Sequence, residues 1–277
     1  MRCNWKALLS ILPARLRQPV DNMGKNSMNE LRCRLDMPPE LVTDNGYSYL
    51  KGEITREELD FIVNTASKYS PWNSSSVANG YLTAPGGHRI GVCGEVVYKN
   101  NQVVGMKSLD SICIRIARDF PGICRQINWD GMSILILGAP GCGKTTLLRD
   151  LIRNISEYES ISVVDERGEL FPEGFYRGTH TDVLTGCPKI LGIERMLRTM
   201  SPSYIAVDEI TSESDSHAVV QASNCGVRLL ATAHACSIED FMNRSAYHSL
   251  VQNKVFQMIV ILKRNKSYVL ERFRYDS

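Results

Sequence analysis

The sequence predicts an α/β protein in which a smaller α+β domain precedes a domain built on a parallel sheet. From Ser133 onward, short apolar runs alternate with segments of helical spacing, as in a parallel sheet with crossover helices. Before that point, two segments have helical spacing, and other segments alternate charged and apolar residues over the length of a strand. A turn-rich stretch at Pro121 separates the two regions. We therefore expect an N-terminal domain at residues 1–128 and a second domain at residues 129–277.

Composition places the chain among ordinary globular proteins and excludes several other classes. The 277 residues are 43% hydrophobic and 22% charged, with a net charge of +2. This near-neutral balance lacks the basic footprint of a dedicated nucleic-acid binder. The nine cysteines are odd in number and form no Cys-x-x-Cys, so we expect reduced thiols. No secretory signal or membrane-length apolar run is evident, which predicts a cytoplasmic protein.

The N-terminal region shows both helical and strand patterns. Residues 4–18 have helical spacing that Pro13 interrupts, which predicts a bent or split helix. Residues 30–35 alternate charged and apolar side chains, as in a half-buried strand. Thr55 and Glu58 form a capping box before a further helix. Further strands are expected near 80–84, 88–98, 103–104 and 111–118, with a hairpin turn at 99–102.

The second region alternates strands and helices throughout. Because ligands in such sheets bind beyond the carboxyl ends of the strands, polar residues at those ends are candidates for a site. The expected strands lie near 133–137, 160–165, 203–208, 228–233 and 256–262, and the expected helices near 143–154, 190–200, 214–224 and 237–250.

A phosphate-binding motif follows the first of these strands. The sequence Gly138-x-x-x-x-Gly143-Lys144-Thr145 stands between an apolar run and a helical pattern. Glycines let backbone N–H groups turn toward phosphates, and the helix N-terminus adds a positive dipole end. Lys144 would reach the outer phosphates, and the Thr145 hydroxyl would ligate Mg²⁺. The motif predicts a nucleoside triphosphate held by the loop Gly138, Ala139, Pro140, Gly141, Cys142, Gly143, Lys144, Thr145 and Thr146.

Two carboxylates end the strand near 203–208. Asp208 would complete the Mg²⁺ shell opposite Thr145, usually through water, and Glu209 would orient and deprotonate the attacking water. Phosphoryl transfer needs mainly positioning and neutralisation of charge. Asp208, Glu209 and Lys144 would therefore supply much of the chemistry.

Two other strand ends leave alternatives open. Asp165 and Glu166 follow the strand near 160–165, either as catalytic groups or as a solvated strand–loop junction. Thr232 or His234, at the end of the strand near 228–233, would sense the γ-phosphate or serve a structural role. The residues alone do not decide between these readings.

These strand-end signatures, in this order, resemble the secretion ATPases of type II and type IV systems. A more specific resemblance is to the stage III sporulation protein AA family, and it covers about residues 8–272. It differs at Thr211, where glycine is expected, at Ala235-Cys236, and in the basic residues after Phe256. The segments that carry it are 29–34, 80–83, 86–94, 114–118, 164–169, 181–189, 200–202 and 206–210.

The resemblance implies a RecA-like, Mg²⁺-dependent ATPase that assembles as a ring, with a hexamer expected. It would act in the mother-cell cytoplasm of an endospore-forming bacterium and power a secretion-like channel through membrane proteins of the sporulation complex. It favours catalytic roles for Glu166 and His234. It also implies that an N-terminal-domain arginine approaches the γ-phosphate, with Arg115 at the matching position and Arg118 and Arg89 as further candidates.

Two competing functions remain. A RecA-like core also serves nucleic-acid translocases, and Arg244 and His248 fit an Arg-x-x-x-His spacing of some single-strand-binding modules. The near-neutral charge and the missing basic–aromatic stripe argue against that reading. A non-hydrolysing nucleotide switch is the other alternative. The complete set of Lys144, Thr145, Asp208 and Glu209 argues against it.

Overall fold

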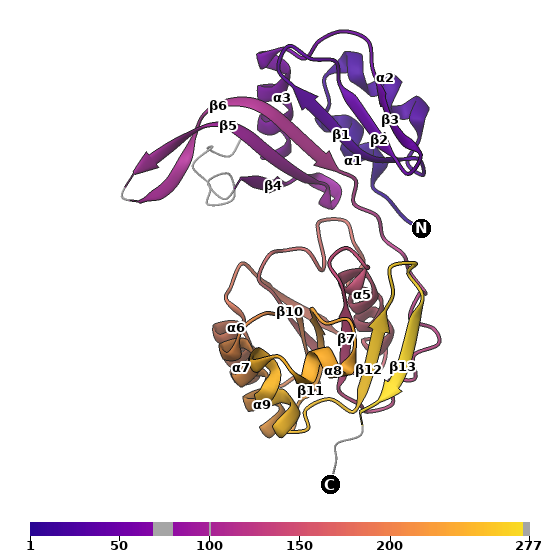
Figure 1. The fold of residues 1–277 in the computed structure, drawn as a ribbon, viewed down its shortest axis with the longest axis vertical. Helices are drawn as coiled ribbons and strands as arrows, with labels where there is room; N and C mark the ends of the chain where they lie inside the picture. The colour runs from indigo at the N-terminus through magenta and orange to yellow at the C-terminus, as the bar shows by residue number, and fades with distance from the viewer. Residues whose placement is uncertain (69–79, 100, 274–277) are drawn as a thin grey trace. The chain divides into compact units, whose positions relative to one another are not determined.

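The chain folds into two compact units in a computed structural model that describes residues 1–68, 80–99 and 101–273 (Figure 1). The first unit comprises Met1–Asp119 and Pro172–Phe175, and the second comprises Phe120–Phe171 and Tyr176–Ser277. Among the described residues, no helix is long and apolar enough to cross a membrane.

The first unit is a six-stranded antiparallel sheet with helices packed on it, in the strand order β3-β2-β1-β6-β5-β4. Leu8 and Leu16 of the helices share one core with Leu31 and Ile112 of the sheet. The elements are α1 (Trp5–Ile11), α2 (Ala14–Met23), β1 (Met28–Arg34), β2 (Glu40–Thr43), β3 (Gly46–Tyr49), α3 (Arg56–Ala66), β4 (Tyr81–Thr83), β5 (Arg89–Lys99) and β6 (Gln102–Arg115).

Several local expectations for this unit are confirmed. Pro13 divides the first helical segment into α1 and α2, and the capping box of Thr55 and Glu58 starts α3. Other expectations are wrong in detail. The segments near 103–104 and 111–118 belong to one strand, β6, because its pairing with β5 continues past bulges. The strand ends at Arg115, before the expected end at residue 118. The hairpin turn expected at 99–102 includes Asn100, which lies outside the described residues.

The second unit is a seven-stranded sheet in the order β13-β12-β7-β11-β10-β8-β9. Six strands are parallel, and β13 pairs antiparallel with β12 at one edge. The elements are β7 (Ile134–Gly138), α5 (Lys144–Ile155), β8 (Ile161–Asp165), β9 (Thr181–Thr185), α6 (Lys189–Met200), β10 (Tyr204–Ile210), α7 (Glu213–Asn224), β11 (Arg228–Ala233), β12 (Met258–Leu262) and β13 (Tyr268–Arg272).

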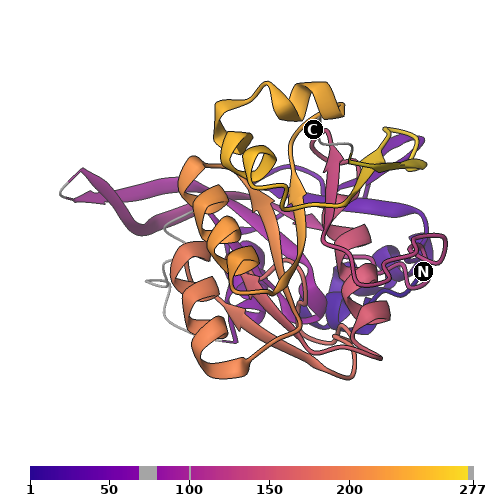
Figure 2. The same cartoon turned by 90° about the horizontal axis from the view of Figure 1, so that it is seen from below.

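Helices cover both faces of this sheet, because alternate residues of its strands point to opposite sides. Ile134 and Ile136 of β7 pack with α5. Leu135 and Leu137 pack in a second core with α6 and α7, whose orange ribbons lie together in Figure 2. Burial of both faces explains the near-continuous apolar strand sequences. The α/β class with a RecA-like core is confirmed.

The helix expected over residues 237–250 is wrong. The chain forms α8 (Ile238–Met242), a 3₁₀ turn (Ser245–Tyr247) and α9 (His248–Gln252). Arg244 has extended backbone angles between these pieces. Tyr247 then stacks on Phe241 and donates its hydroxyl to the carbonyl of Ile210 at 3.2 Å. These tertiary contacts compete with a continuous helix.

The start of the second unit lies before the boundary at residue 128 that the sequence suggests. The amides of Gly122 and Cys124 each donate to the carboxylate of Asp150 at 2.9 Å. Cys124 and Ile127 are buried in the core beneath α5. Hydrogen bonds and burial thus attach this loop to the second unit, although its composition is that of a linker.

Candidate nucleotide-binding site

The loop after β7 has the backbone that a phosphate-binding loop requires. Gly141 and Gly143 have φ angles of 73° and 100°, in the left-handed region that favours glycine. Gly143 is the N-cap of α5, so the first amides of the helix follow directly. The nine residues predicted to bind phosphate, Gly138 to Thr146, therefore form one continuous turn from strand end to helix start.

Lys144 is buried at the start of α5. Its ammonium group donates to the carbonyls of Gly138 at 2.8 Å and Ala139 at 3.1 Å. The same group lies 3.0 Å from Nδ1 of His234. Burial lowers the pKa of Lys144, while the carboxylates of Asp208 and Glu209 oppose that shift. The lysine thus joins the phosphate loop to the ends of β10 and β11.

Asp208 lies where the sequence suggests, opposite Thr145. The Thr145 hydroxyl donates to one oxygen of Asp208 at 2.8 Å, and the Thr232 hydroxyl donates to the other at 2.6 Å. The two threonines come from different elements, Thr145 from α5 and Thr232 from β11. The structure therefore brings the two proposed metal ligands into contact, and Thr232 holds the second oxygen of the carboxylate.

Glu209 occupies a bulge at the end of β10. The register between β10 and β11 shifts between Val207 and Ile210, and Glu209 has a φ of 58°. A non-glycine residue in this region carries about 1–3 kcal/mol of strain, which is common at functional sites. The Glu209 amide donates to the Thr232 hydroxyl at 2.8 Å, which holds this conformation. The bulge turns two successive carboxylates toward the same loop.

Two side chains hold the Glu209 carboxylate. One oxygen lies 2.6 Å from Nε2 of His234, and the other lies 3.1 Å from the Arg167 guanidinium. Burial alone would raise the pKa of Glu209, but the His234 hydrogen bond and the Arg167 charge together lower it. His234, which directly follows β11, therefore contacts both Lys144 and Glu209. Glu209 is kept ionised, the form that accepts a proton.

The acidic segment after β8 separates into two roles. Asp165 is buried and accepts hydrogen bonds from the amides of Glu169 and Leu170 at 2.9 and 2.8 Å, so it shapes the following turn. Burial raises the pKa of Asp165, and these amides oppose the shift. Glu166 instead pairs with Lys189 at 2.7 Å and lines a pocket with Asp208 and Glu209. Asp165 also lines this pocket, but its carboxylate is bonded to the backbone of its own turn, whereas the Glu166 carboxylate reaches Lys189.

The arginine candidates lie in the first unit. Arg115, at the end of β6, is 66% exposed and lies 3.6 Å from Glu30. Arg118 donates to the Asn29 side chain at 2.7 Å and to the Met28 carbonyl at 2.6 Å. Arg89 lies over the Tyr81 ring, 4.4 Å from its centre. Arg118 is thus engaged in holding β1, whereas the Arg115 side chain extends into solvent from its unit.

The residues present fit a Mg²⁺ ion. Asp208 and Thr145 offer hard oxygen atoms side by side, and Mg²⁺ in phosphate-transfer sites uses one or two such ligands together with phosphates and water. Within the described part of the chain, no cluster of three or more His, Cys, Asp or Glu side chains suits a metal.

Sequence reasoning missed two contributors to the site. Arg167 contacts Glu209, and Lys189 contacts Glu166 while lying 3.7 Å from Asp215. Lys189 is buried at the first position of α6, although a lysine before a helix usually remains solvated. Lys189 is the last residue of the segment 181–189, one of those that carry the family resemblance, and this was the signal in the sequence that could have identified it.

Comparison with known proteins gives the family. The model for sporulation stage III, protein AA, matches residues 4–276. The stage III sporulation protein AA of Bacillus subtilis is 33% identical over 94% of this chain and 91% of its own length. The chain belongs to the stage III sporulation protein AA family. A relative from Cyanidium caldarium, the uncharacterized protein ycf45, is 26% identical over 84% of this chain and 73% of its own length.

Solved structures show that this chain shares its fold with an ATPase and with a pilus retraction motor. The Legionella pneumophila ATPase DotB superposes with a TM-score of 0.61, at 16% identity, over 94% of this chain and 80% of its own. The pilus retraction motor PilT with bound ADP gives 0.65, at 14% identity, over 92% and 80%. At such identities the likeness shows the fold alone.

Proposed function

We propose that this stage III AA family protein is a Mg²⁺-dependent ATPase that drives a secretion-like complex in endospore formation. The observation that carries the proposal is one connected set of hydrogen bonds. It joins Lys144 and Thr145 of the phosphate loop to Asp208 and Glu209 of β10 through Thr232 and His234 of β11. The family and the ATPase fold support it.

Each residue would have a defined task in hydrolysis. The loop amides and Lys144 would bind the β- and γ-phosphates. Thr145 and Asp208 would hold Mg²⁺, whose chemistry when bound would be to neutralise charge on the phosphates. Glu209 accepts a hydrogen bond from water and aligns it with the γ-phosphorus, while His234 holds the carboxylate. Glu166 supports the same pocket through Lys189.

An arginine would complete the site. We assign this role to Arg115, because its guanidinium is largely exposed and its ion pair with Glu30 is long, at 3.6 Å. Arg118 already donates to the Asn29 side chain and to the Met28 carbonyl, both in β1. We therefore assign it a supporting role in the fold. An arginine that neutralises the transferring phosphoryl accelerates related enzymes by about 10³–10⁵.

The motor reading rests on the family and on the fold. PilT, which shares the fold, is a pilus retraction motor crystallised with ADP. By analogy we propose a ring-shaped homo-oligomer, a hexamer, in the mother-cell cytoplasm, docked to membrane proteins of the sporulation channel. Assembly would bring the positive charge of Arg115 to each phosphate loop.

The translocase alternative gains no support. Arg244 forms two bonds to Asp240, at 2.9 and 3.1 Å, and Asp240 also caps the turn at Cys236. The positive charge of Arg244 is thus paired with Asp240 of the neighbouring helix α8. We therefore keep the ATPase motor as the proposed function.

One experiment tests the proposal. The purified protein is assayed for ATP hydrolysis with Mg²⁺, and its mass is measured by light scattering in the same sample, with and without ATP. We expect hydrolysis and a larger mass with ATP. The Lys144→Ala variant should lose both, because the loop then lacks its cation. Hydrolysis that equals the wild-type rate in Lys144→Ala would refute the proposed site.

A further inference from the structure

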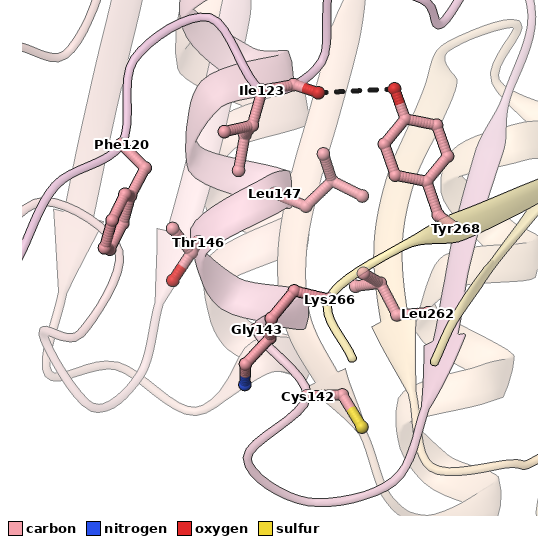
Figure 3. Close-up of a pocket in the computed structure, with 9 residues that line it drawn as sticks. All are labelled: Phe120, Ile123, Cys142, Gly143, Thr146, Leu147, Leu262, Lys266 and Tyr268. Atoms are coloured by element: carbon pink, nitrogen blue, oxygen red, sulfur yellow. Dashed lines mark hydrogen bonds between the residues drawn. The ribbon is translucent and has the colours of Figure 1, made fainter. Parts of the chain in front are cut away.

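An apolar slot opens beside the phosphate loop within the second unit (Figure 3). Its volume is about 260 Å³. Three segments far apart in the sequence line it: Phe120 and Ile123 from the start of the unit, Leu147 from α5, and Tyr268 from the start of β13. None of these side chains belongs to the catalytic set described above.

Specific contacts hold the walls of the slot in place. The Tyr268 hydroxyl donates to the Ile123 carbonyl at 3.3 Å, which ties β13 to the segment at the start of the unit (Figure 3). Lys266, in the turn between β12 and β13, donates to the carbonyl of Gly141 in the phosphate loop. Lys266 has a φ of 69°, so the turn is fixed in a conformation unusual for lysine. The wall of the slot is therefore connected to the phosphate loop by the hydrogen bond from Lys266 to Gly141.

The position of the slot indicates its occupant. Cys142, Gly143 and Thr146 line it and also belong to the phosphate loop, so a ligand held by the loop passes directly into the slot. The walls bear aromatic and aliphatic carbon atoms, which suit a planar, weakly hydrated group. A nucleotide has such a group at the end opposite its phosphates.

We propose that this slot takes the purine base of the nucleotide and recognises it by shape and apolar contact rather than by reading its edge. This inference rests on the proposed function. The Tyr268 hydroxyl and the Ile123 carbonyl already bond to each other. The Lys266 ammonium, which also lines the slot, donates to the Gly141 carbonyl, and the Thr146 hydroxyl belongs to the loop proposed to bind the phosphates.

Binding measurements with Mg²⁺–ATP, Mg²⁺–GTP and Mg²⁺–tripolyphosphate test the slot separately from the loop. Tripolyphosphate has the phosphates and no base. We expect wild-type protein to bind ATP at least about tenfold more tightly than tripolyphosphate, because base contacts with aromatic walls are worth roughly this much. GTP should bind within tenfold of ATP.

Ile123→Asn is the informative variant, because Ile123 is 38% exposed and a neutral polar side chain there neither empties a core nor repels phosphates. We expect about a tenfold loss of ATP affinity and unchanged tripolyphosphate affinity. Leu191→Asn, at an exposed position on α6, is the matched control and should change neither. Circular dichroism and thermal unfolding verify that both variants are folded. Phe120→Ala provides a second, independent change in the slot.

The outcomes separate the two proposals. Wild-type protein that binds neither ATP nor tripolyphosphate refutes the nucleotide site itself. Equal affinity for ATP and tripolyphosphate, or slot variants that bind ATP like wild type, refutes the slot while leaving the loop intact. A folded Ile123→Asn variant that loses tripolyphosphate as well also refutes it. A preference of more than tenfold for one purine shows that the edge of the base is read.

Discussion

Nε2 of His234 lies 2.6 Å from the carboxylate of Glu209, while Nδ1 of the same ring lies 3.0 Å from the Lys144 ammonium. An ammonium group only donates, so Nδ1 accepts and Nε2 carries the hydrogen that reaches Glu209. A neutral imidazole therefore satisfies both contacts. This ring physically connects the residue proposed to bind phosphate with the residue proposed to activate water.

The first prediction concerns Glu209. Glu209→Gln removes the basic oxygen while keeping a side chain that can still bond to His234. We expect ATP affinity within a few-fold of wild type and turnover lowered by about 10²–10⁴, the usual contribution of a general base. Titration with a fluorescent ATP analogue and a phosphate-release assay measure the two quantities. Unchanged turnover would remove Glu209 as the base.

Thr232→Val tests the support for both carboxylates. Valine has nearly the same shape but no hydroxyl, so Asp208 loses a donor and the Glu209 amide loses its acceptor. Because Thr232 is fully buried, we expect a loss of about 1–3 kcal/mol in unfolding free energy. Turnover should fall as well. Urea denaturation and ATPase assays measure these effects, and Thr232→Ser, which keeps the hydroxyl, should restore most of the turnover.

Arg115 and Arg118 offer a paired comparison. Arg115→Ala removes an exposed charge and should lower turnover of the assembled protein while leaving its melting temperature nearly unchanged. Arg118→Ala removes the bonds to Asn29 and Met28 and should cost about 1 kcal/mol of stability. Differential scanning calorimetry and ATPase assays of both variants distinguish the roles. Wild-type turnover in assembled Arg115→Ala would contradict the proposed finger.

The fourth prediction is a pH dependence from His88. This side chain is fully buried, with Nε2 3.1 Å from the Asn4 carbonyl and Nδ1 accepting from the Ala117 amide at 3.2 Å. Burial lowers the pKa of His88, and the Asn4 carbonyl opposes this only in part. The unfolded chain therefore binds a proton more readily than the folded one. Stability should be constant above the ordinary histidine pKa of about 6.5 and fall below it, by at most about 1.4 kcal/mol per pH unit.

Denaturation of the full chain between pH 5 and 8 measures this slope. His88→Gln removes the titrating ring and should flatten the decline below pH 6.5, although the variant is less stable at neutral pH. His248, which is exposed at the start of α9, is the control, and His248→Gln should keep the wild-type slope. The same slope in His88→Gln as in wild type would exclude His88 as its source.

The sequence predicted the centre of the second unit well, because its signals are local. The glycines of the phosphate loop, the apolar strands and the carboxylates after β10 each appear within a few residues. The meeting of strand ends at one edge then follows from parallel pairing. Contacts that depend on distant partners were not predictable in this way. Lys189 with Glu166 and the left-handed backbone of Glu209 depend on how neighbouring strands and helices pack.

Short edge elements also escaped prediction. The strand β9 is half exposed and polar, and the hairpin of β2 and β3 has only four residues in each strand. Such segments bury too little apolar surface for their pattern to show in the sequence. The break after α8 arises from the stacking of Tyr247 on Phe241, which no helical periodicity reveals.

The Thr232 hydroxyl has a consequence for how this site can change. A single oxygen donates to Asp208 and accepts from the Glu209 backbone. Serine could replace both bonds but would leave unfilled space in the strand, and valine would fill the space but break both bonds. In the proposed site, a change at Thr232 would therefore alter metal affinity and the placement of the attacking water together. If the protein is the proposed ATPase, differences in turnover between relatives would have to arise elsewhere, such as at Arg115 or at the contacts that bring it to the phosphates.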